Sequence, residues 1–274
     1  MQRKKRWKTI FPYCQAICRH TRHVLCFIAY LADMKFYYDL HIHSALSPCG
    51  DVDMTPNNIV NMALINQLDI IAVSDHNSCK NLEPVSQVAK QNGLVFIAAM
   101  ELETAEEIHV LCLFPTVEKA MLFENEVVAP SLADIKNDER IFGRQQILDA
   151  QDNEIGTDDR YLINATSITI DEIYNLVNDY DGVAIPAHID KQTKSLISVL
   201  GMTDASMGFK TFELSKNVSD DFTKTQFSLK DMPYKYIYNS DAHYLQDIFE
   251  RENCHFFEFD ERPSPEILIK MLKE

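Results

Sequence analysis

Six of the nine histidines in this chain stand next to each other or next to acidic residues, close to where apolar runs end. They are His41-Ile42-His43, Asp75-His76, His109 after Glu101, Ala187-His188 and Asp241-Ala242-His243. A single histidine of this kind is most simply a core residue with a satisfied hydrogen bond, but six together are poorly explained in that way. Imidazole and carboxylate groups are donors that zinc and similar divalent cations accept in proteins. The pattern therefore indicates a metal centre.

Apolar periodicity and capping residues predict the elements that must position these donors. A strand is expected over 36–43, and Thr55-Pro56 supplies an N-cap and an N1 proline for a helix to about Leu68. The segment 69–74 has the near-continuous apolar pattern of a strand buried on both faces. Further strands are expected at 94–100, 108–114, 183–186, 210–214, 234–238 and 254–259, and further helices at 82–92, 170–179, near 195–200 and from Ser264. This alternation predicts an α/β fold, either a βα barrel or an open doubly wound sheet.

The spacing of the histidines fits a shared site at one edge of such a fold. Side chains at the carboxyl ends of barrel strands point toward one site. Successive residues of a strand face opposite sides, so the two rings of His41-Ile42-His43 share a face and can bind one cation.

Residues 115–168 interrupt the regular alternation. The segment 117–135 resembles an acidic helix, and 140–170 mixes polar turns with short apolar runs. The stretch is too long for a plain connection between a strand and a helix. It is either an insertion over the catalytic edge, such as a lid or substrate-selecting subdomain, or an ordinary helical excursion along the side of the fold.

Length and charge restrict the class of protein. A chain of 274 residues with 46% hydrophobic residues suits one sizeable core, and the default is one catalytic domain. With 26 Lys and Arg against 41 Asp and Glu, its formal charge of −15 disfavours long nucleic acid and stable association with anionic membranes. A small substrate is expected. The seven cysteines form no regular framework, which favours a reducing cytoplasm.

The first 33 residues differ in composition from the rest. They hold seven Lys and Arg and one acid, so residues 34–274 carry 19 basic and 40 acidic side chains, a charge of −21. An apolar run at 24–32 is too short to span a bilayer and has no convincing cleavage site after it. We interpret residues 1–33 as an extension outside the fold, with a membrane-associating segment or an amphipathic helix as alternatives.

The motifs together resemble those of the PHP (polymerase and histidinol phosphatase) domain family. The matching stretches are Asp39-Leu40-His41-Ile42-His43-Ser44, Val73-Ser74-Asp75-His76-Asn77, Met100-Glu101 with His109 after it, Pro186-Ala187-His188 and Ser240-Asp241-Ala242-His243. The resemblance covers nearly all of residues 35–274. It implies a distorted (β/α)7 TIM-like barrel with a helical insertion at 115–168. It also implies up to three divalent cations, commonly zinc, manganese or iron, that hydrolyse phosphoesters.

The resemblance also implies how the ligands are shared. It places His41, His43, Glu101 and Asp241 on one cation, His109 and His188 on a second that Glu101 bridges, and His76 and His243 on a third. The third position needs one more ligand. Asp51 is preferred and Asp53 is the alternative. Cys49 is a further candidate, because thiolate suits zinc, although a small buried hydrophobic role is the simpler interpretation of that side chain.

Neighbouring residues have expected roles as well. Asp39 and Asp75 flank ligands and would orient imidazoles by accepting their second N–H. Asp75 is counted with Glu101 and Asp241 as catalytic, because it could instead donate a proton. Lys191 and Arg144 could bind substrate phosphate as fixed cations, the alternative for each being solvated surface charge.

The favoured function is hydrolysis of a small phosphorylated metabolite or nucleotide, such as a nucleoside 3',5'-bisphosphate or an oligonucleotide end. Three divalent cations with Asp51, Glu101 and Asp241 would leave about three net positive charges, which attract a phosphate dianion. Alternatives are a histidinol-phosphatase-like monoesterase, an amidohydrolase-type barrel that cleaves C–N bonds, and a non-catalytic binding module. The retention of all nine candidate ligands disfavours the last of these.

Overall fold

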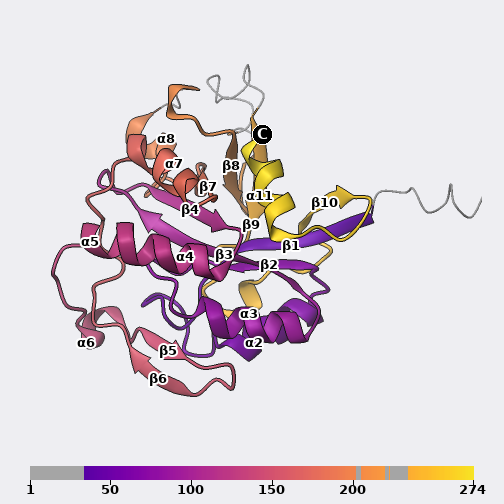
Figure 1. The fold of residues 1–274 in the computed structure, drawn as a ribbon, viewed down its shortest axis with the longest axis horizontal. Helices are drawn as coiled ribbons and strands as arrows, with labels where there is room; N and C mark the ends of the chain where they lie inside the picture. Colours follow the sequence, from indigo (N-terminus) through magenta and orange to yellow (C-terminus); the bar gives the residue numbers. More distant parts are fainter. Residues whose placement is uncertain (1–33, 202–204, 220–221, 223–233) are drawn as a thin grey trace, which may run out of the picture. The chain divides into compact units, whose positions relative to one another are not determined.

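A six-stranded mixed sheet forms the centre of the fold (Figure 1). In spatial order its strands are β10 (His255–Phe259), β1 (Met34–Ile42), β2 (Ile70–Val73), β3 (Val95–Glu103), β4 (His109–Phe114) and β7 (Val183–Pro186). Strands β1, β2 and β3 are parallel, whereas β4 is antiparallel to both β3 and β7. A separate parallel pair consists of β8 (Thr211–Ser215) and β9 (Lys235–Asn239).

The computed structural model describes residues 34–201, 205–219, 222 and 234–274. The interpretation of residues 1–33 as an extension lies outside these ranges. Residues 36–257 and 263–274 make up one compact unit, which carries most of the sheet, the helices and the histidine motifs. Within the described ranges, no helix has both the length and the apolar character needed to cross a membrane.

The helices begin where their capping residues predict. The predicted set is confirmed as α2 (Pro56–Ile65), α3 (Leu82–Gln91), α7 (Ile170–Asp179), α8 (Leu196–Leu200) and α11 (Pro265–Lys273). The hydroxyls of Thr55 and Ser264 accept the backbone N–H groups of Asn58 and Ile267, and each is followed by a proline at the first helical position. Short 3-10 turns lie at Ala205–Met207 and Leu245–Asp247.

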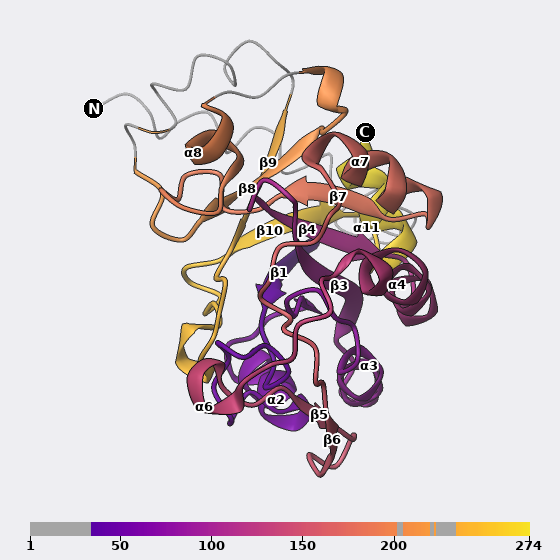
Figure 2. The ribbon, with the colours of Figure 1, turned by 90° about the vertical axis from the view of Figure 1, so that its left-hand side faces the viewer.

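The α/β class is confirmed, but the closed (β/α)7 barrel is not. The structure has a curled half-barrel of six strands instead (Figures 1 and 2). The β8–β9 pair meets the sheet through isolated contacts: Ile189 N donates to Glu213 O at 2.9 Å, and His43 N donates to Ala242 O at 2.9 Å. The antiparallel course of β4 has a simple cause, because the short link from Glu103 to His109 cannot hold a parallel crossover of a dozen or more residues.

The insertion at 115–168 begins along the side of the sheet and then returns to the loops. Its elements are α4 (Val117–Phe123), a π-helical turn (Glu124–Val128), α5 (Ala129–Ser131), α6 (Glu139–Phe142), β5 (Gln146–Leu148) and β6 (Glu154–Thr157). The expected helix over 117–135 is therefore helical to Ser131. The β5–β6 hairpin lies beside α2 in both views (Figures 1 and 2). Gln146 N donates to Ala45 O at 2.9 Å, and Asn77 Nδ2 donates to Leu162 O at 2.7 Å. The insertion thus supports the loops that follow β1 and β2.

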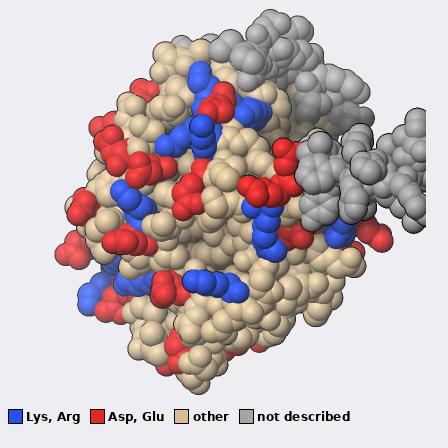
Figure 3. Space-filling model, turned by 45° about the vertical axis from the view of Figure 1, so that its right-hand side comes forward, with Lys and Arg blue, Asp and Glu red and all other residues tan. Residues whose placement is uncertain are grey.

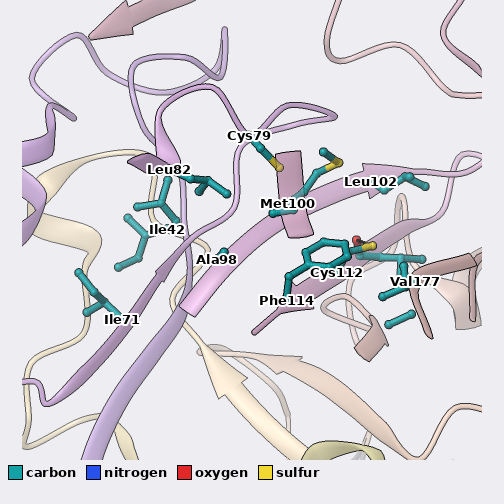
Figure 4. Close-up of a cluster of buried hydrophobic side chains, with 14 of the residues drawn as sticks. Ile42, Ile71, Cys79, Leu82, Ala98, Met100, Leu102, Cys112, Phe114 and Val177 are labelled. Atoms are coloured by element: carbon teal, nitrogen blue, oxygen red, sulfur yellow. Dashed lines mark hydrogen bonds between the residues drawn. The ribbon is translucent and has the colours of Figure 1, made fainter. Parts of the chain in front are cut away.

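Strand alternation separates an apolar core from a polar face. Figure 4 shows Ala98, Met100 and Leu102 of β3 among the buried side chains that pack with Cys112 and Phe114 of β4. The residues between them on each strand face the other side of the sheet. Those residues include Glu101 and Glu103 on β3 and His109 on β4, together with His41 on β1. The core face therefore fixes the strands that carry the metal-ligand candidates.

A buried ion-pair network ties the insertion to the loop after β2. Glu124 is 1% exposed and accepts Arg160 Nη2 at 2.6 Å, Cys79 N at 2.6 Å and Ser78 Oγ at 3.1 Å. Arg160 Nη2 also contacts Asp158 Oδ2 at 2.6 Å.

Replacement of Glu124 by Ala is expected to lower the free energy of unfolding by about 3 kcal/mol. The substitution leaves Arg160 with one carboxylate fewer and removes the acceptor of a buried backbone N–H. Urea denaturation would measure the loss. Glu118→Ala, at an exposed position of α4, is the matched control and should change stability by no more than about 0.5 kcal/mol. An equal loss in both variants would contradict the importance of the network.

Candidate metal centre

The predicted ligands come from separate strands and meet at one place. His41 lies on β1 and His43 follows it; His76 follows β2, Glu101 lies near the end of β3, His109 begins β4, His188 follows β7, and Asp241 and His243 follow β9. The carboxyl ends of parallel strands share an edge, and the antiparallel β4 brings its first residue to that same edge.

Glu101 is at the centre of this group. It is 1% exposed, and its two oxygens face five imidazoles. Oε1 lies 3.3 Å from His41 Nε2, 2.8 Å from His109 Nδ1 and 3.1 Å from His188 Nε2. Oε2 lies 3.4 Å from His43 Nε2 and 3.1 Å from His76 Nδ1. One carboxylate that reaches so many rings is placed to bridge two cations.

Asp241 closes the group on the side of β1. Its Oδ1 lies 3.4 Å from His41 Nε2, 3.1 Å from His43 Nε2 and 3.8 Å from His243 Nδ1. Its Oδ2 pairs with Lys191 Nζ. Asp241 therefore stands between the imidazoles and a lysine at the edge of the cluster.

Other residues hold the outer nitrogens of the rings. His41 Nδ1 donates to Glu213 at 2.9 Å, and His109 Nε2 donates to Glu103 at 3.3 Å. His43 Nδ1 lies 3.0 Å from Ser47 Oγ. In each ring the second nitrogen is left facing Glu101 or Asp241. This arrangement is typical of metal-ligating histidines, whose outer N–H is fixed by a carboxylate or another acceptor.

Buried imidazole nitrogens without hydrogen-bond partners fit a site that binds cations. Four buried imidazole nitrogens have no hydrogen-bond partner: His41 Nε2, His76 Nδ1, His109 Nδ1 and His188 Nδ1. Three of them face Glu101 closely, yet not in hydrogen-bond geometry. Unpaired buried polar atoms are costly, and a divalent cation between an imidazole and a carboxylate would satisfy both.

Three groups of donors could each hold a cation, with ligand atoms within 4.8 Å of one another. They are His41, His43, Glu101 and Asp241; His76, Glu101 and His109; and His43, Cys49, His76 and His243. The first group is the set that the resemblance implied. In the second, His76 stands where His188 was expected, although His188 Nε2 contacts Glu101 as well.

The comparison with known families agrees with this geometry. The model of the PHP domain matches residues 39–250, which is most of the chain. The chain belongs to the PHP domain family. This membership confirms the family that the histidine motifs predicted and, with it, the prediction of an enzyme. No curated protein matches the sequence.

Solved structures similar to this PHP domain show the same fold at low identity. The lesion-specific endonuclease PfuEndoQ from Pyrococcus furiosus has a TM-score of 0.59 and 21% identity, and the match covers 88% of this chain and 56% of that one. A putative metal-dependent phosphoesterase from Bifidobacterium adolescentis has a TM-score of 0.54 and 15% identity, with 79% and 93% covered. An amidohydrolase from Chromobacterium violaceum has a TM-score of 0.51 and 17% identity, with 84% and 93% covered. The chain thus spans just over half the length of PfuEndoQ.

The third group of this PHP domain differs from the prediction. Asp51, the preferred ligand, is not in it, and Asp51 Oδ1 accepts the backbone N–H of Asp53 at 2.9 Å. Asp53 is exposed and is also outside the group. Cys49 takes the expected place beside His76 and His243. The turn between His43 and α2 therefore presents the thiol of Cys49 where a carboxylate was expected.

The carboxylates and imidazoles of the site change one another's pKa values. Burial alone would raise the pKa of Glu101, but His109, His41 and His76 hold it well below the ordinary value. Burial alone would lower the pKa of His109, but Glu101 and Glu103 raise it to about 9. Burial and the neighbouring His43 lower the pKa of His243 to about 4. The buried Glu101 carboxylate therefore stays ionised, and protonated imidazoles or metal cations must offset its charge.

Asp75 acts on the ligands through hydroxyl groups. Its carboxylate, fully buried, accepts Ser44 Oγ at 2.6 Å, Ser47 Oγ at 2.7 Å and Ser44 N at 2.7 Å. Because Ser47 Oγ also meets His43 Nδ1, the chain of hydrogen bonds orients His43. Asp39 accepts the backbone N–H groups of Ser240 and Phe249, and within the described residues it accepts no imidazole N–H, which differs from the expected role. Burial raises the pKa of Asp39 to about 6.

The two predicted phosphate-binding cations lie in different places. Lys191 lines the cavities beside Asp241 and His243. Arg144 pairs with Glu154 Oε1 at 2.5 Å on the β5–β6 hairpin and lines none of the cavities found at the centre. Lys191 therefore lies beside the metal-ligand candidates, whereas Arg144 lies in an exposed ion pair away from them.

Sequence reasoning missed two carboxylates that position the ligands. Glu213 is 1% exposed and binds His41 Nδ1, the backbone N of His188 at 2.9 Å and Asn239 Nδ2 at 2.6 Å. Glu103 contacts His109 and accepts Lys194 Nζ at 2.6 Å. The available signals were a single acid inside the apolar strand 210–214, and an acid two residues after Glu101 on the same strand face.

Replacement of Glu213 by Gln is expected to weaken zinc binding about 10- to 100-fold, because His41 loses the carboxylate that fixes its ring. Titration of the metal-stripped protein with zinc would measure the affinity. Glu83→Gln on the exposed side of α3 is the control. An unchanged affinity in the Glu213 variant would show that His41 is held by packing alone.

Proposed function

We propose that this PHP domain is a metal-dependent phosphoesterase that hydrolyses a small phosphorylated metabolite or nucleotide, such as a nucleoside 3',5'-bisphosphate or an oligonucleotide end. The observation that carries the proposal is the buried convergence of six histidines on Glu101 and Asp241, with inner nitrogens that lack hydrogen-bond partners. Up to three divalent cations, zinc, manganese or iron, would be held there. When bound, they activate water and stabilise a leaving oxygen.

The protein side chains contribute binding and orientation. Glu101 and Asp241 provide the negative charge that retains the cations, and they are catalytic in that sense. Lys191 reaches Asp241 from the edge of the cavity, so its ammonium group is placed to donate to a phosphate oxygen of the substrate. Asp75 remains a positioning residue, because its carboxylate is fully buried and already accepts three hydrogen bonds.

The rest of the substrate has room beside Asp241 and His243. A cavity of about 460 Å³ lies there, lined in part by Lys191, Lys216 and Gln192. This volume is in the range of small-molecule sites, about 300 to 1000 Å³. Two lysines beside a centre loaded with divalent cations suit a substrate with more than one anionic group, as in a bisphosphate or a nucleotide.

A nucleic-acid substrate is the second candidate. A similar solved structure is endonuclease Q in complex with a 27-mer duplex that has an abasic lesion at the active site, at a TM-score of 0.52 and 21% identity; the match covers 77% of this chain and 50% of that one. This likeness weakens the expectation that long nucleic acid is excluded. Against it stand the formal charge of −15 and the face in Figure 3, where Lys and Arg are interspersed with Asp and Glu. A nucleic-acid end fits these charges better than a long duplex.

A panel of substrates tests the proposal. The purified protein, loaded in turn with zinc, manganese and iron, would be assayed on phosphomonoesters including histidinol phosphate, on nucleoside bisphosphates, on duplex DNA with an abasic lesion and on amides. Phosphate release that disappears in His41→Ala is the expected result. Hydrolysis of amides without any phosphoester would favour the amidohydrolase alternative and contradict the proposal, as would activity that His41→Ala leaves unchanged.

Replacement of Lys191 by Met is expected to lower kcat/KM about 10- to 150-fold, mainly through KM. A hydrogen bond to a charged group is worth about 1.5–3 kcal/mol, and about 1.4 kcal/mol corresponds to a factor of ten. Steady-state kinetics on the best substrate of the panel would measure it. Lys90→Met, exposed on α3, should have wild-type kinetics. A Lys191 variant with an unchanged KM would place the phosphate elsewhere.

A further inference from the structure

The thiol of Cys49 belongs to the metal centre by position. It is grouped with His43, His76 and His243, with one ligand atom from each within 4.8 Å of the others. We propose that Cys49 binds a divalent cation as a thiolate, together with His76 and His243, and makes this position of the centre selective for zinc. The inference rests on the metal centre of the proposed function and not on the reaction that it performs.

The backbone holds Cys49 in this place from both sides. Gly50 N donates to Ser47 O at 2.8 Å, and a Cβ at Gly50 would lie 2.4 Å from Ser44 O, so no other residue fits this turn without displacing it. Asp51 N donates to His243 O at 2.9 Å, which joins the turn to the loop of a neighbouring ligand. On the outer side, a Cβ at Gly143 would lie 2.6 Å from Pro48 O, so the insertion packs directly on the turn.

The remaining ligands are divided between the cations by the atoms that they present. His43 Nε2 faces both Glu101 and Asp241, and its Nδ1 is occupied by Ser47, so this ring belongs to the cation of those carboxylates. Cys49 and His243 are left for a separate cation. His76 stands in both remaining groups, and we assign it to the cation of Cys49 because His188 Nε2 also contacts Glu101 and can take the place of His76 beside His109. One sulfur and two imidazole nitrogens with an open fourth position is a donor set that zinc accepts.

The thiolate also determines which metal is preferred. Soft sulfur ligands favour zinc and related ions, whereas oxygen ligands suit manganese and magnesium. A carboxylate at this position would leave the choice open, as His, Asp and Glu sites accept several metals. Cys49 therefore restricts the choice of metal at one site of the centre. The site of Glu101 and Asp241 has mixed oxygen and nitrogen ligands and can accept several metals.

Cobalt(II) titration of the metal-stripped, full-length protein tests the inference, because a thiolate bound to cobalt gives a charge-transfer absorption in the near ultraviolet. The wild type is expected to show this band, and Cys49→Ser is expected to lose it together with about one equivalent of bound metal. Cys254→Ser and Asp51→Asn are the controls and should keep both the band and the stoichiometry. Circular dichroism of each variant shows that it has folded.

A second measurement does not depend on any variant. Zinc should protect Cys49 of the wild-type protein from alkylation, as mapped by mass spectrometry of the labelled cysteines. Cobalt binding without the band, or an equal rate of alkylation with and without zinc, would overturn the role of Cys49 and leave the other ligands untouched. Failure of the wild type to bind cobalt at all would instead contradict the metal centre as a whole.

Discussion

Replacement of Glu101 by Gln is expected to lower kcat/KM for phosphoester hydrolysis about 1000-fold or more. Glu101 is the carboxylate that faces five imidazoles, and Gln removes its negative charge while keeping its size. Metal cations contribute several kcal/mol to catalysis by stabilising charge, and a loss of about 4 kcal/mol corresponds to about a thousandfold. Kinetics together with metal analysis of the same preparation would measure the effect.

The control for this variant is Glu107→Gln, an exposed glutamate that pairs with Lys194. It should retain full activity and full metal content. If Glu101→Gln kept more than a tenth of the wild-type activity, Glu101 could not be the residue that bridges the cations. If it lost activity but kept all its metal, the role of Glu101 would lie with the substrate instead.

Removal of the metals is expected to abolish activity and to lower stability by about 4 kcal/mol for each site that was filled at a thousand times its dissociation constant. For a chain of this size, that loss corresponds to a decrease in Tm of roughly 10 °C. The physical reason is that the stripped protein keeps buried carboxylates and unpaired imidazole nitrogens. A chelator followed by readdition of zinc or manganese, with thermal unfolding and activity measured at each step, would test both effects.

The metal affinity of the centre is expected to depend on pH, and the imidazoles determine the direction of the change. In the metal-free protein the pKa of His109 is raised to about 9, so this ring is protonated at neutral pH and must release a proton before it binds a cation. Metal affinity is therefore expected to rise as pH rises toward 9. A chelator that changed neither Tm nor activity would contradict the metal centre. The decrease in Tm that the chelator causes should be smaller in Glu101→Gln than in Glu107→Gln.

Much of the fold and of the site was predictable from the sequence, because local patterns report local structure. Caps such as Thr55-Pro56 mark helix starts, and the strand alternation of His41-Ile42-His43 places both rings on one face. The order of the motifs along the chain then gave the family. The predicted metal ligands on strands and strand ends lie together as the motifs implied, with Asp51 as the exception.

The rest depends on contacts between distant segments, which no local pattern reports. The direction of β4 follows from the length of one short link, and the pairing of β8 with β9 outside the six-stranded sheet joins segments that are distant in the sequence. Asp51 and Cys49 are only two residues apart, and the turn at Gly50 decides which of them faces the histidines. Asp241 has a φ of 53°, a left-handed conformation that aims its side chain and that its residue type does not reveal.

The junction between the β8–β9 pair and the six-stranded sheet gives the cations a mechanical role as well. Asp241 follows β9 and His41 lies on β1, so an ion that both residues bind would connect neighbouring segments that are far apart in the sequence. Such an ion would act as a reversible cross-link over this junction, in addition to the hydrogen bonds that Leu40 N donates to Asn239 and Ser240 N donates to Asp39. Local opening of proteins begins where few hydrogen bonds must break. Loss of the ion would remove interactions from this junction, so metal occupancy is expected to reduce how often the metal-binding edge opens.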